Sequence, residues 1–166
     1  IALAIYFDSG RPILLRQLRV GLDGQPFNML KFRTMHTSEA EVEATEWSAD
    51  EDRITKVGRV LRDTSLDELP QLVNVVRGEM SLVGPRPERP HFVDMFSERY
   101  PNYAERHRLP AGVTGWSQIH GLRGDTSIEE RAAFDNYYVD NWSLSQDIKI
   151  LLRTVTAFKN TPGGSI

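Results

Sequence analysis

Two adjacent carboxylates, Asp67 and Glu68, stand where a helix is expected to begin in this chain. Ser65 lies three residues before Glu68, which is the spacing of a capping box, where a serine hydroxyl accepts from an early backbone N–H and the glutamate reaches back. Pro70 is tolerated only near the start of a helix, and Gly78 suits the position after a helix end. The spacing predicts a helix from Ser65 to about Gly78. Such spacing more often marks an ordinary helix start than a site that does chemistry.

Both carboxylates would stay ionised in such a first turn, because unpaired N–H groups and the helix dipole favour negative charge. An ionised carboxylate can bind a divalent metal ion or attack an electrophilic phosphorus. Phosphoryl chemistry also requires cations that neutralise the phosphate oxygens. The elements that could bring such cations to Asp67 and Glu68 therefore decide what the pair can do.

A β-hairpin is the first of these elements. Runs 13–20 and 27–33 flank an Asp-Gly turn signal and carry strand-like patterning. In the second run Lys31 and Arg33 alternate with Phe32, so both cations should project from one face. Such alternation more often marks a strand face exposed to solvent than a pair of functional cations. The pattern alone does not decide between the two.

Two further segments supply arginines. The stretch before Ser65 predicts a short amphipathic helix with cations three residues apart, namely Arg53, Lys56, Arg59 and Arg62. Pro85 and Pro87 enclose Arg86 in a stiff, non-helical segment that leaves the guanidinium little conformational entropy to lose. Arginine suits bidentate recognition of phosphate or carboxylate. The cationic stripe more often marks a solvent-exposed helix face, and the Pro-Arg-Pro segment more often marks a rigid connector.

Composition excludes several classes of protein. The 20 Lys and Arg against 23 Asp and Glu give a net charge of −3, so no overall field recruits nucleic acid, which is not an expected partner. The absence of cysteine excludes a disulfide scaffold, a cysteine nucleophile and thiolate zinc sites. The four histidines show no metal-binding spacing.

The rest of the chain predicts a mostly helical α+β single domain with one N-terminal hairpin, built from residues 10–160. Helices are expected within 88–106, broken by a proline, from the Ser127 cap to about Asn141, and over 143–159. The apolar stripe of the last helix fits either core or a membrane interface. The acidic stretch 38–52 is expected to be a solvated helix plus loop.

The two ends of the chain carry separate expectations. The apolar residues within 1–9 are expected to be the end of a longer, truncated hydrophobic segment, although a buried terminal strand or helix end is equally compatible with so short a run. Residues 161–166 are expected to be a flexible tail.

Several motifs occur in a fixed order and carry a resemblance to a known family. They are 31–35 (KFRTM), 53–58 (RITKVG), 65–72 (SLDELPQL), 80–87 (MSLVGPRP), 112–116 (GVTGW) and 140–143 (DNWS). With the closing helix, they resemble the bacterial sugar transferase family, the monotopic polyprenyl-phosphate phosphoglycosyl transferases. The resemblance extends from Gly10 to Lys159. It is closest to the catalytic domain of larger undecaprenyl-phosphate hexose-phosphate transferases.

The resemblance implies a reaction and roles for particular residues. Members transfer a sugar phosphate from a nucleotide diphosphate sugar to a polyprenyl phosphate and release the nucleoside monophosphate. By resemblance, Asp67 attacks the sugar-bearing phosphorus to form a covalent phosphosugar intermediate, and Glu68, with Asp67, holds Mg²⁺. The substrate-binding residues expected around this dyad are Lys31, Arg33, Arg62, Pro85, Arg86 and Pro87.

The resemblance also implies partners and a location. The donor is expected to be a UDP-sugar, with glucose or galactose favoured and N-acetylated or diamino sugars left open. The acceptor is undecaprenyl phosphate, and the reaction is the first step of exopolysaccharide, capsule or O-antigen assembly. Amphipathic interfacial helices would place the domain on the cytoplasmic face of a bacterial inner membrane, and residues 1–9 would end a membrane segment. A homo-oligomer is left open.

Two rival functions share part of this inventory. A catalytically silent, membrane-associated scaffold would keep the fold for assembly, but the intact dyad argues against it. A metal-dependent phosphodiester hydrolase would use the same carboxylates and cations, and it would turn over without a lipid acceptor.

Overall fold

The computed structural model describes residues 1–36, 51–122, 124 and 126–160. Its helices and strands are α1 (Ala2–Ser9), β1 (Leu14–Val20), β2 (Pro26–Phe32), α2 (Lys56–Asp63), α3 (Gln71–Val76), β3 (Ser81–Val83), α4 (Pro90–Arg99), β4 (Gly112–Thr114), α5 (Trp116–Ile119), α6 (Ile128–Asp140) and α7 (Leu144–Asn160). Short 3₁₀ segments are η1 (Leu22–Gly24), η3 (Glu51–Arg53), η4 (Leu66–Glu68) and η5 (Tyr103–Arg108). The predicted α+β class with an N-terminal hairpin is confirmed.

The hairpin forms as the sequence predicts. Strands β1 and β2 pair antiparallel, with Leu14 opposite Phe32 and Val20 opposite Pro26. The connection is longer than a two-residue turn and contains η1, where Asp23 and Gly24 both have positive φ. Asp and Gly tolerate this left-handed backbone better than most residues, which explains why the Asp-Gly signal marked the turn.

A second, smaller sheet was not predicted. Strands β3 and β4 pair in parallel, with Ser81 opposite Gly112 and Val83 opposite Thr114. The backbones approach so closely that a Cβ added to Gly112 would lie 2.1 Å from the backbone nitrogen of Gly84. This contact fixes the chain immediately before Pro85, whose carbonyl accepts from the Gly112 N–H at 2.9 Å.

The predicted capping box at Ser65 is wrong. Ser65 has a left-handed backbone with φ of 53°, and in the described part of the chain its side chain makes no capping hydrogen bond. Residues Leu66–Glu68 form a 3₁₀ turn, and α3 begins only at Gln71, after Pro70. The left-handed turn takes the hydroxyl away from the helix N–H groups, and the Glu68 carboxylate instead meets an arginine from a distant segment. Gly78 has φ of 77° after α3, as predicted.

The other predicted helices are present. In α2 the Thr55 side chain accepts from the Gly58 N–H at 2.9 Å. At the start of α6, Ser127 accepts from the Glu130 N–H at 3.3 Å, which confirms the second capping signal. The predicted 88–106 helix is divided by Pro101 into α4 and η5. The break at Pro101 and the cap at Ser127 therefore act here as the sequence indicates.

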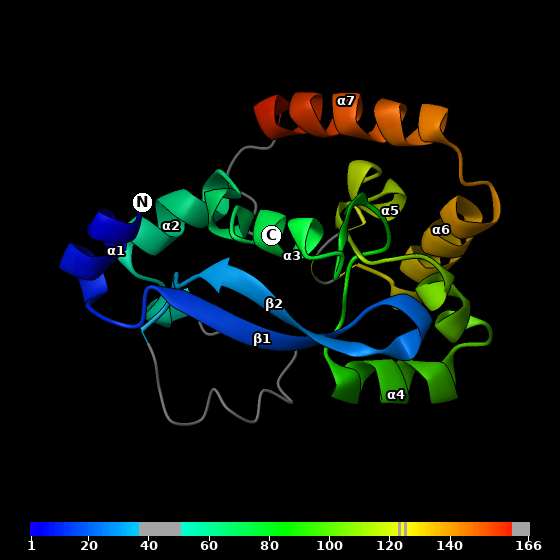
Figure 1. The fold of residues 1–166 in the computed structure, drawn as a ribbon, viewed down its shortest axis with the longest axis horizontal. Helices are drawn as coiled ribbons and strands as arrows, with labels where there is room; N and C mark the ends of the chain where they lie inside the picture. Colours follow the sequence, from blue (N-terminus) through cyan, green and yellow to red (C-terminus); the bar gives the residue numbers. More distant parts are fainter. Residues whose placement is uncertain (37–50, 123, 125, 161–166) are drawn as a thin grey trace.

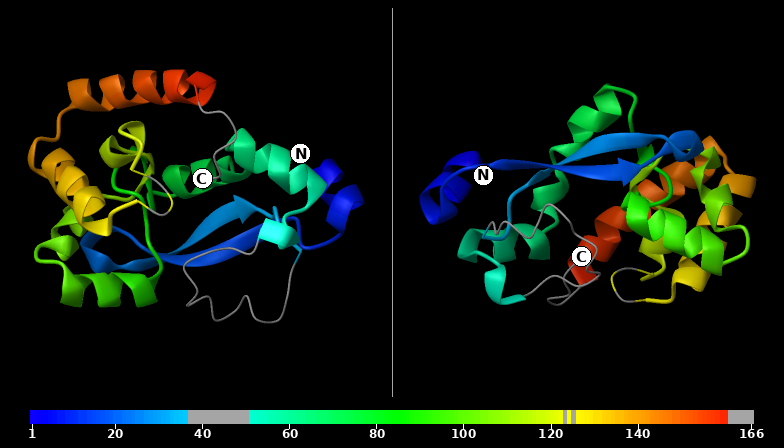
Figure 2. Two further views of the ribbon diagram at one scale, coloured as in Figure 1. Left: turned by 180° about the vertical axis from the view of Figure 1, so that it is seen from behind. Right: turned by 90° about the horizontal axis from the view of Figure 1, so that it is seen from below.

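Two apolar clusters hold these elements together. The larger one joins the end of β1 to α4, η5 and α6 through Val20, Phe92, Val93, Phe96, Tyr103 and Ala132. The smaller one, Val83, Tyr138 and Ile150, anchors α7 against β3 and α6. Helix α7 lies along one side of the molecule and α4 along the opposite side, with the hairpin and α3 between them (Figures 1 and 2).

None of the helices within the described ranges is long and apolar enough to cross a membrane. Helix α1 is anchored by Ile5, which is buried, while Leu3 and Phe7 are exposed. Nearly all of the acidic stretch 38–52 and the whole of the predicted tail 161–166 lie outside the described residues.

Candidate active site

Asp67 is buried and held by a cation from the hairpin. It lies in η4 and is only 2% exposed, and its Oδ2 is 2.7 Å from the Nζ of Lys31. Lys31 comes from β2, and its side chain keeps 15% of its surface exposed. A buried carboxylate needs a partner of opposite charge, and here that partner still reaches solvent.

Glu68 is held by a second cation, from the opposite direction along the chain. The Arg86 Nη2 donates to Glu68 Oε1 at 2.9 Å, and the Arg86 side chain is 26% exposed. Glu68 raises the pKa of the Arg86 guanidinium, and this attraction outweighs burial, which acts in the opposite direction. The dyad therefore consists of two adjacent carboxylates, each paired with its own partly exposed cation.

The remaining predicted residues are placed differently. Arg33 is buried, and its guanidinium donates to the carbonyls of Gly10 and Arg11 and to the Ser9 hydroxyl. It therefore fastens the end of α1 to the hairpin instead of joining the dyad, and the expected substrate-binding role finds no support in its contacts. Alternation along β2 could not reveal this, because the partner carbonyls lie 22 and 23 residues away.

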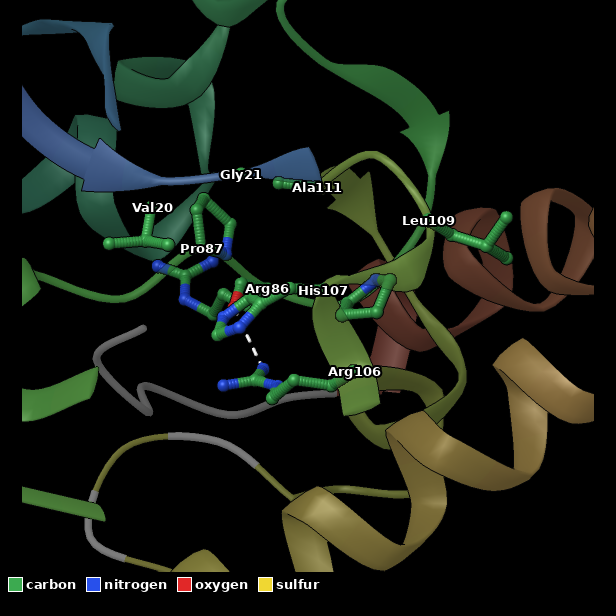
Figure 3. A pocket seen from close by; sticks show the side chains of 9 residues that line it. Val20, Gly21, Arg86, Pro87, Arg106, His107, Leu109 and Ala111 are labelled. Carbon is green, nitrogen blue, oxygen red and sulfur yellow. Dashed lines mark hydrogen bonds between the residues drawn. The ribbon is translucent and has the colours of Figure 1, made fainter. Parts of the chain in front are cut away.

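Arg62 ends α2, directly before the turn that carries the dyad. Its Nε is buried without a hydrogen-bond partner among the described residues, and so is the hydroxyl oxygen of Ser65. Buried polar atoms normally have partners, so these two atoms are exceptions beside the turn that carries the dyad. Pro85 and Pro87 flank Arg86 and line a narrow crevice with it (Figure 3).

The dyad also fits a magnesium ion by its chemistry. Mg²⁺ prefers oxygen ligands, and sites for phosphoryl transfer commonly bind it through one or two carboxylates together with substrate phosphates. Asp67 and Glu68 supply such a pair. No group of three or more His, Cys, Asp or Glu side chains suited to a metal occurs in the described ranges. The donor set thus suits an ion shared with a bound diphosphate better than one caged by protein alone.

One residue that positions the site escaped the sequence reasoning. Asn74 in α3 is fully buried, and its Oδ1 accepts from the Leu30 N–H at 3.0 Å. Its Nδ2 donates to the Asn28 carbonyl at 2.8 Å and to Glu79 Oε2 at 2.6 Å. These bonds attach α3, which follows the dyad, to β2, which carries Lys31. No local pattern marks an asparagine for this role.

The sequence also gave no sign of a group of buried charged residues that includes Glu88 and Arg106. Glu88 is paired with Arg131 of α6 at 3.2 Å and with Arg19 of β1 at 3.8 Å. Arg106 of η5 is paired with Asp135 of α6 at 2.5 Å. The side chains of charged residues are rarely buried, so sequence-based reasoning assigns them to the surface by default.

His107 lines the crevice beside Arg86 and Arg106 (Figure 3). Burial lowers its pKa to about 4, and the positive charge of Arg106 acts in the same direction. The imidazole is therefore neutral at pH 7, which avoids adding a third positive charge beside the two guanidinium groups.

Residues 1–161 match the family model described as bacterial sugar transferase. The chain is 49% identical over 164 residues to a UDP-glucose:undecaprenyl-phosphate glucose-1-phosphate transferase of Caulobacter vibrioides, with 96% of this chain and 61% of that protein covered. A protein of Escherichia coli with the same name is 44% identical, with coverages of 93% and 34%.

A third relative has a different sugar in its name. The UDP-N-acetylgalactosamine-undecaprenyl-phosphate N-acetylgalactosaminephosphotransferase of Aeromonas hydrophila is 40% identical, with 93% of this chain and 37% of that protein covered. The chain thus spans between about a third and three fifths of the length of these relatives. On the family model and these identities, the chain belongs to the bacterial sugar transferase family.

Proposed function

We propose that this chain catalyses the transfer of glucose 1-phosphate from UDP-glucose to undecaprenyl phosphate, with release of UMP. The observation that carries the proposal is the paired dyad, in which Lys31 holds Asp67 and Arg86 holds Glu68. Each cation is partly exposed, so each can exchange a carboxylate oxygen for a phosphate oxygen when a diphosphate binds. The names of the relatives from Caulobacter and Escherichia support this donor and acceptor.

The reaction proceeds in two displacements at one phosphorus. An Asp67 oxygen forms a bond to the sugar-bearing phosphorus of the donor, the bond from that phosphorus to the bridging oxygen breaks, and UMP leaves with the electron pair. An oxygen of undecaprenyl phosphate then attacks the same phosphorus. The bond to Asp67 breaks, which frees the carboxylate and yields the lipid diphosphate sugar. Two steps at a carboxylate nucleophile replace one difficult transfer between two anionic substrates.

The cations make this attack electrostatically feasible. An anionic carboxylate and an anionic diphosphate repel each other, and the repulsion is strong in a site of low dielectric constant. Lys31 is paired with Asp67 and Arg86 with Glu68, so both cations can neutralise charge that develops at the dyad. Arg62 lies in the last turn of α2, directly before the turn that carries the dyad, and it is the proposed further cation for a phosphate oxygen of the donor or acceptor.

Mg²⁺ is the proposed cofactor. Glu68, together with Asp67, would hold it, and when bound it neutralises the diphosphate and polarises its oxygens. Glu68 would then have to leave Arg86 at least in part, since both compete for the carboxylate. The freed guanidinium becomes available to the substrate phosphates.

The proposed location is the cytoplasmic face of a bacterial inner membrane, where undecaprenyl phosphate is available. Helix α7 carries exposed apolar side chains, namely Leu144, Ile148, Leu151, Leu152 and Val155. The segment from η4 through α3 carries another set, namely Leu66, Leu69, Leu72, Val73 and Val76. Figure 1 shows α7 on the side of the molecule opposite α4, with α3 in between. Apolar surface of this extent marks a membrane or protein contact.

UMP release from UDP-glucose tests the function directly. The whole protein is incubated with Mg²⁺ and undecaprenyl phosphate, and parallel reactions omit the lipid, omit the metal, or replace the donor with UDP-galactose or UDP-N-acetylgalactosamine. We expect sustained turnover only with lipid and metal, fastest with UDP-glucose. Sustained turnover without lipid would indicate a hydrolase, and no turnover with any of the three donors would contradict transfer of these sugars.

A further inference from the structure

The Arg106–Asp135 pair is the most deeply buried ion pair within the described ranges. Both side chains are 1% exposed, and the Arg106 Nη2 donates to Asp135 Oδ2 at 2.5 Å. The Arg106 Nη1 donates to the hydroxyl of Tyr103 at 2.7 Å. Burial disfavours the charged guanidinium, but Asp135 and the other neighbours raise the pKa of Arg106, so it stays protonated.

Arg106 makes a further bond that points to the site. Its Nη2 also donates to the main-chain carbonyl of Arg86 at 2.8 Å, which is the dashed line of Figure 3. The same residue's guanidinium holds Glu68 of the dyad. Prolines on both sides restrict the φ angles around Arg86, so fixing its carbonyl fixes the direction in which its side chain leaves the chain.

The buried pair leaves two polar atoms unsatisfied within the described ranges. Arg106 Nε and Asp135 Oδ1 are buried and make no hydrogen bond to any other described residue. Unpaired buried polar atoms and desolvated charges cost free energy, and a buried ion pair is weak evidence of a stabilising role. Although these two atoms stay unpaired, Arg106 still donates to the Arg86 carbonyl.

We propose that Arg106, oriented by Asp135, is a positioning residue that acts through the Arg86 carbonyl to aim the Arg86 guanidinium at Glu68 and the substrate phosphate. This inference rests on the proposed phosphoglycosyl transfer and adds a residue to its machinery. The competing explanation is a purely structural role. In that case the pair joins η5 to α6, and the bond to Arg86 has no effect on activity.

Arg106→Lys separates these explanations. A lysine can keep the charge opposite Asp135, but its ammonium is a point charge and does not reproduce the planar fork that serves Asp135, Tyr103 and the Arg86 carbonyl together. We expect kcat/KM to fall roughly tenfold, the effect of losing one charge-assisted hydrogen bond. The fall should lie mainly in kcat if Arg86 binds the transition state more tightly than the ground state.

A double-mutant cycle with Arg86→Lys gives the decisive comparison. If Arg106 acts through Arg86, Arg106→Lys should lower kcat/KM by less than about threefold in the Arg86→Lys background, because the side chain to be aimed is already altered. Equal fold-losses in both backgrounds would overturn the proposal. The control is Arg108→Lys, on the same 3₁₀ segment but exposed, which should change kcat/KM less than about twofold in either background.

NMR of the arginine side chains tests the proposal without depending on activity. In protein labelled with ¹⁵N-arginine, the Arg86 side-chain signals, assigned by their loss in Arg86→Lys, should show restricted rotation in the wild type. They should become averaged in Arg106→Lys. Unchanged signals would overturn the proposal even if the chain proved inactive as a transferase. Should Arg106→Lys fail to fold, Tyr103→Phe removes one anchor of Arg106, and it should loosen the same signals; unchanged signals there would again contradict the proposal.

Discussion

Two of the clusters in which carboxylates are paired with cations differ in their contact with solvent. In the dyad, Lys31 and Arg86 keep 15% and 26% of their side chains exposed. In the cluster behind it, Arg106 and Asp135 are 1% exposed and have further fixed partners in Tyr103 and the Arg86 backbone. The first cluster can exchange its partners, whereas the second is locked.

This difference assigns separate roles to chemically similar pairs. A cation that reaches solvent can leave its carboxylate for an incoming phosphate at little cost, because water and the ligand replace the lost contact. A dry pair cannot open without leaving a bare charge in the interior. The two clusters meet at Arg86, whose side chain belongs to the open one and whose carbonyl belongs to the locked one.

Removing the proposed nucleophile should produce the largest effect. Asp67→Asn keeps the size of the side chain and removes the attacking charge, so UMP release should fall at least about a thousandfold. The free energy of unfolding should fall by less than about 2 kcal/mol, because Lys31 can turn toward solvent. Activity assays and urea unfolding measure the two effects. Retained activity would remove Asp67 as the nucleophile.

The locked cluster should respond in the opposite way. Asp135→Asn leaves the Arg106 charge buried without its counter-ion, so the free energy of unfolding should fall by about 3–5 kcal/mol. Urea unfolding followed by circular dichroism measures this loss. A loss no larger than that of Asp67→Asn would erase the distinction between the two clusters.

Acidification should weaken the region around the locked cluster. Burial holds the pKa of His107 at about 4, below its value in the unfolded chain, so the unfolded state binds more protons between pH 6.5 and 4. The free energy of unfolding should therefore fall as the pH is lowered through this range, by up to about 3 kcal/mol at 1.36 kcal/mol per pKa unit.

His107→Gln tests this assignment. Unfolding free energies of the variant at pH 7 and pH 4.5 should differ by less than those of the wild type, since the titrating group is gone. The matched control is His91→Gln at an exposed position, which should keep the wild-type difference. An identical pH dependence in His107→Gln and the wild type would show that other groups cause the loss.

The smallest loss of stability and activity is expected at a third kind of ion pair, which is exposed to solvent. Arg108 and Asp140 form an ion pair with both side chains more than half exposed. Asp140→Asn should lower the free energy of unfolding by less than about 1 kcal/mol, because solvent screens the charges. UMP release should stay within about twofold of wild type. A loss comparable to that of Asp135→Asn would refute burial as the distinguishing factor.

Much of this organisation could be predicted from local sequence. The hairpin, α2, α6 and α7 follow from periodicity, turn residues and caps, and the dyad with Lys31 and Arg86 follows from motifs that resemble the family. The Ser65 capping box failed because tertiary contacts override local preference: Arg86, 18 residues from Glu68, takes the carboxylate that the cap would need.

Other features have no local signal at all. Strands β3 and β4 are three residues long, too short for a period to appear. Arg106 and Asp135 are 29 residues apart, and Asn74 reaches strand residues 44 and 46 positions away. Nothing near Arg33 in the sequence distinguished an anchor for α1 from a substrate-binding cation. Long-range pairing of buried polar groups is decided by the assembled fold, which local patterns do not record.

The central claim is that Asp67 becomes covalently linked to a phosphosugar, and intact-mass spectrometry tests it most directly. Wild-type protein is mixed with UDP-glucose and Mg²⁺ without lipid acceptor and measured at once. We expect a new species heavier by one hexosyl phosphoryl group, which disappears when undecaprenyl phosphate is added and never forms in Asp67→Asn. An adduct of the same mass in Asp67→Asn, or none in a wild-type sample that turns over with the acceptor, would contradict the account.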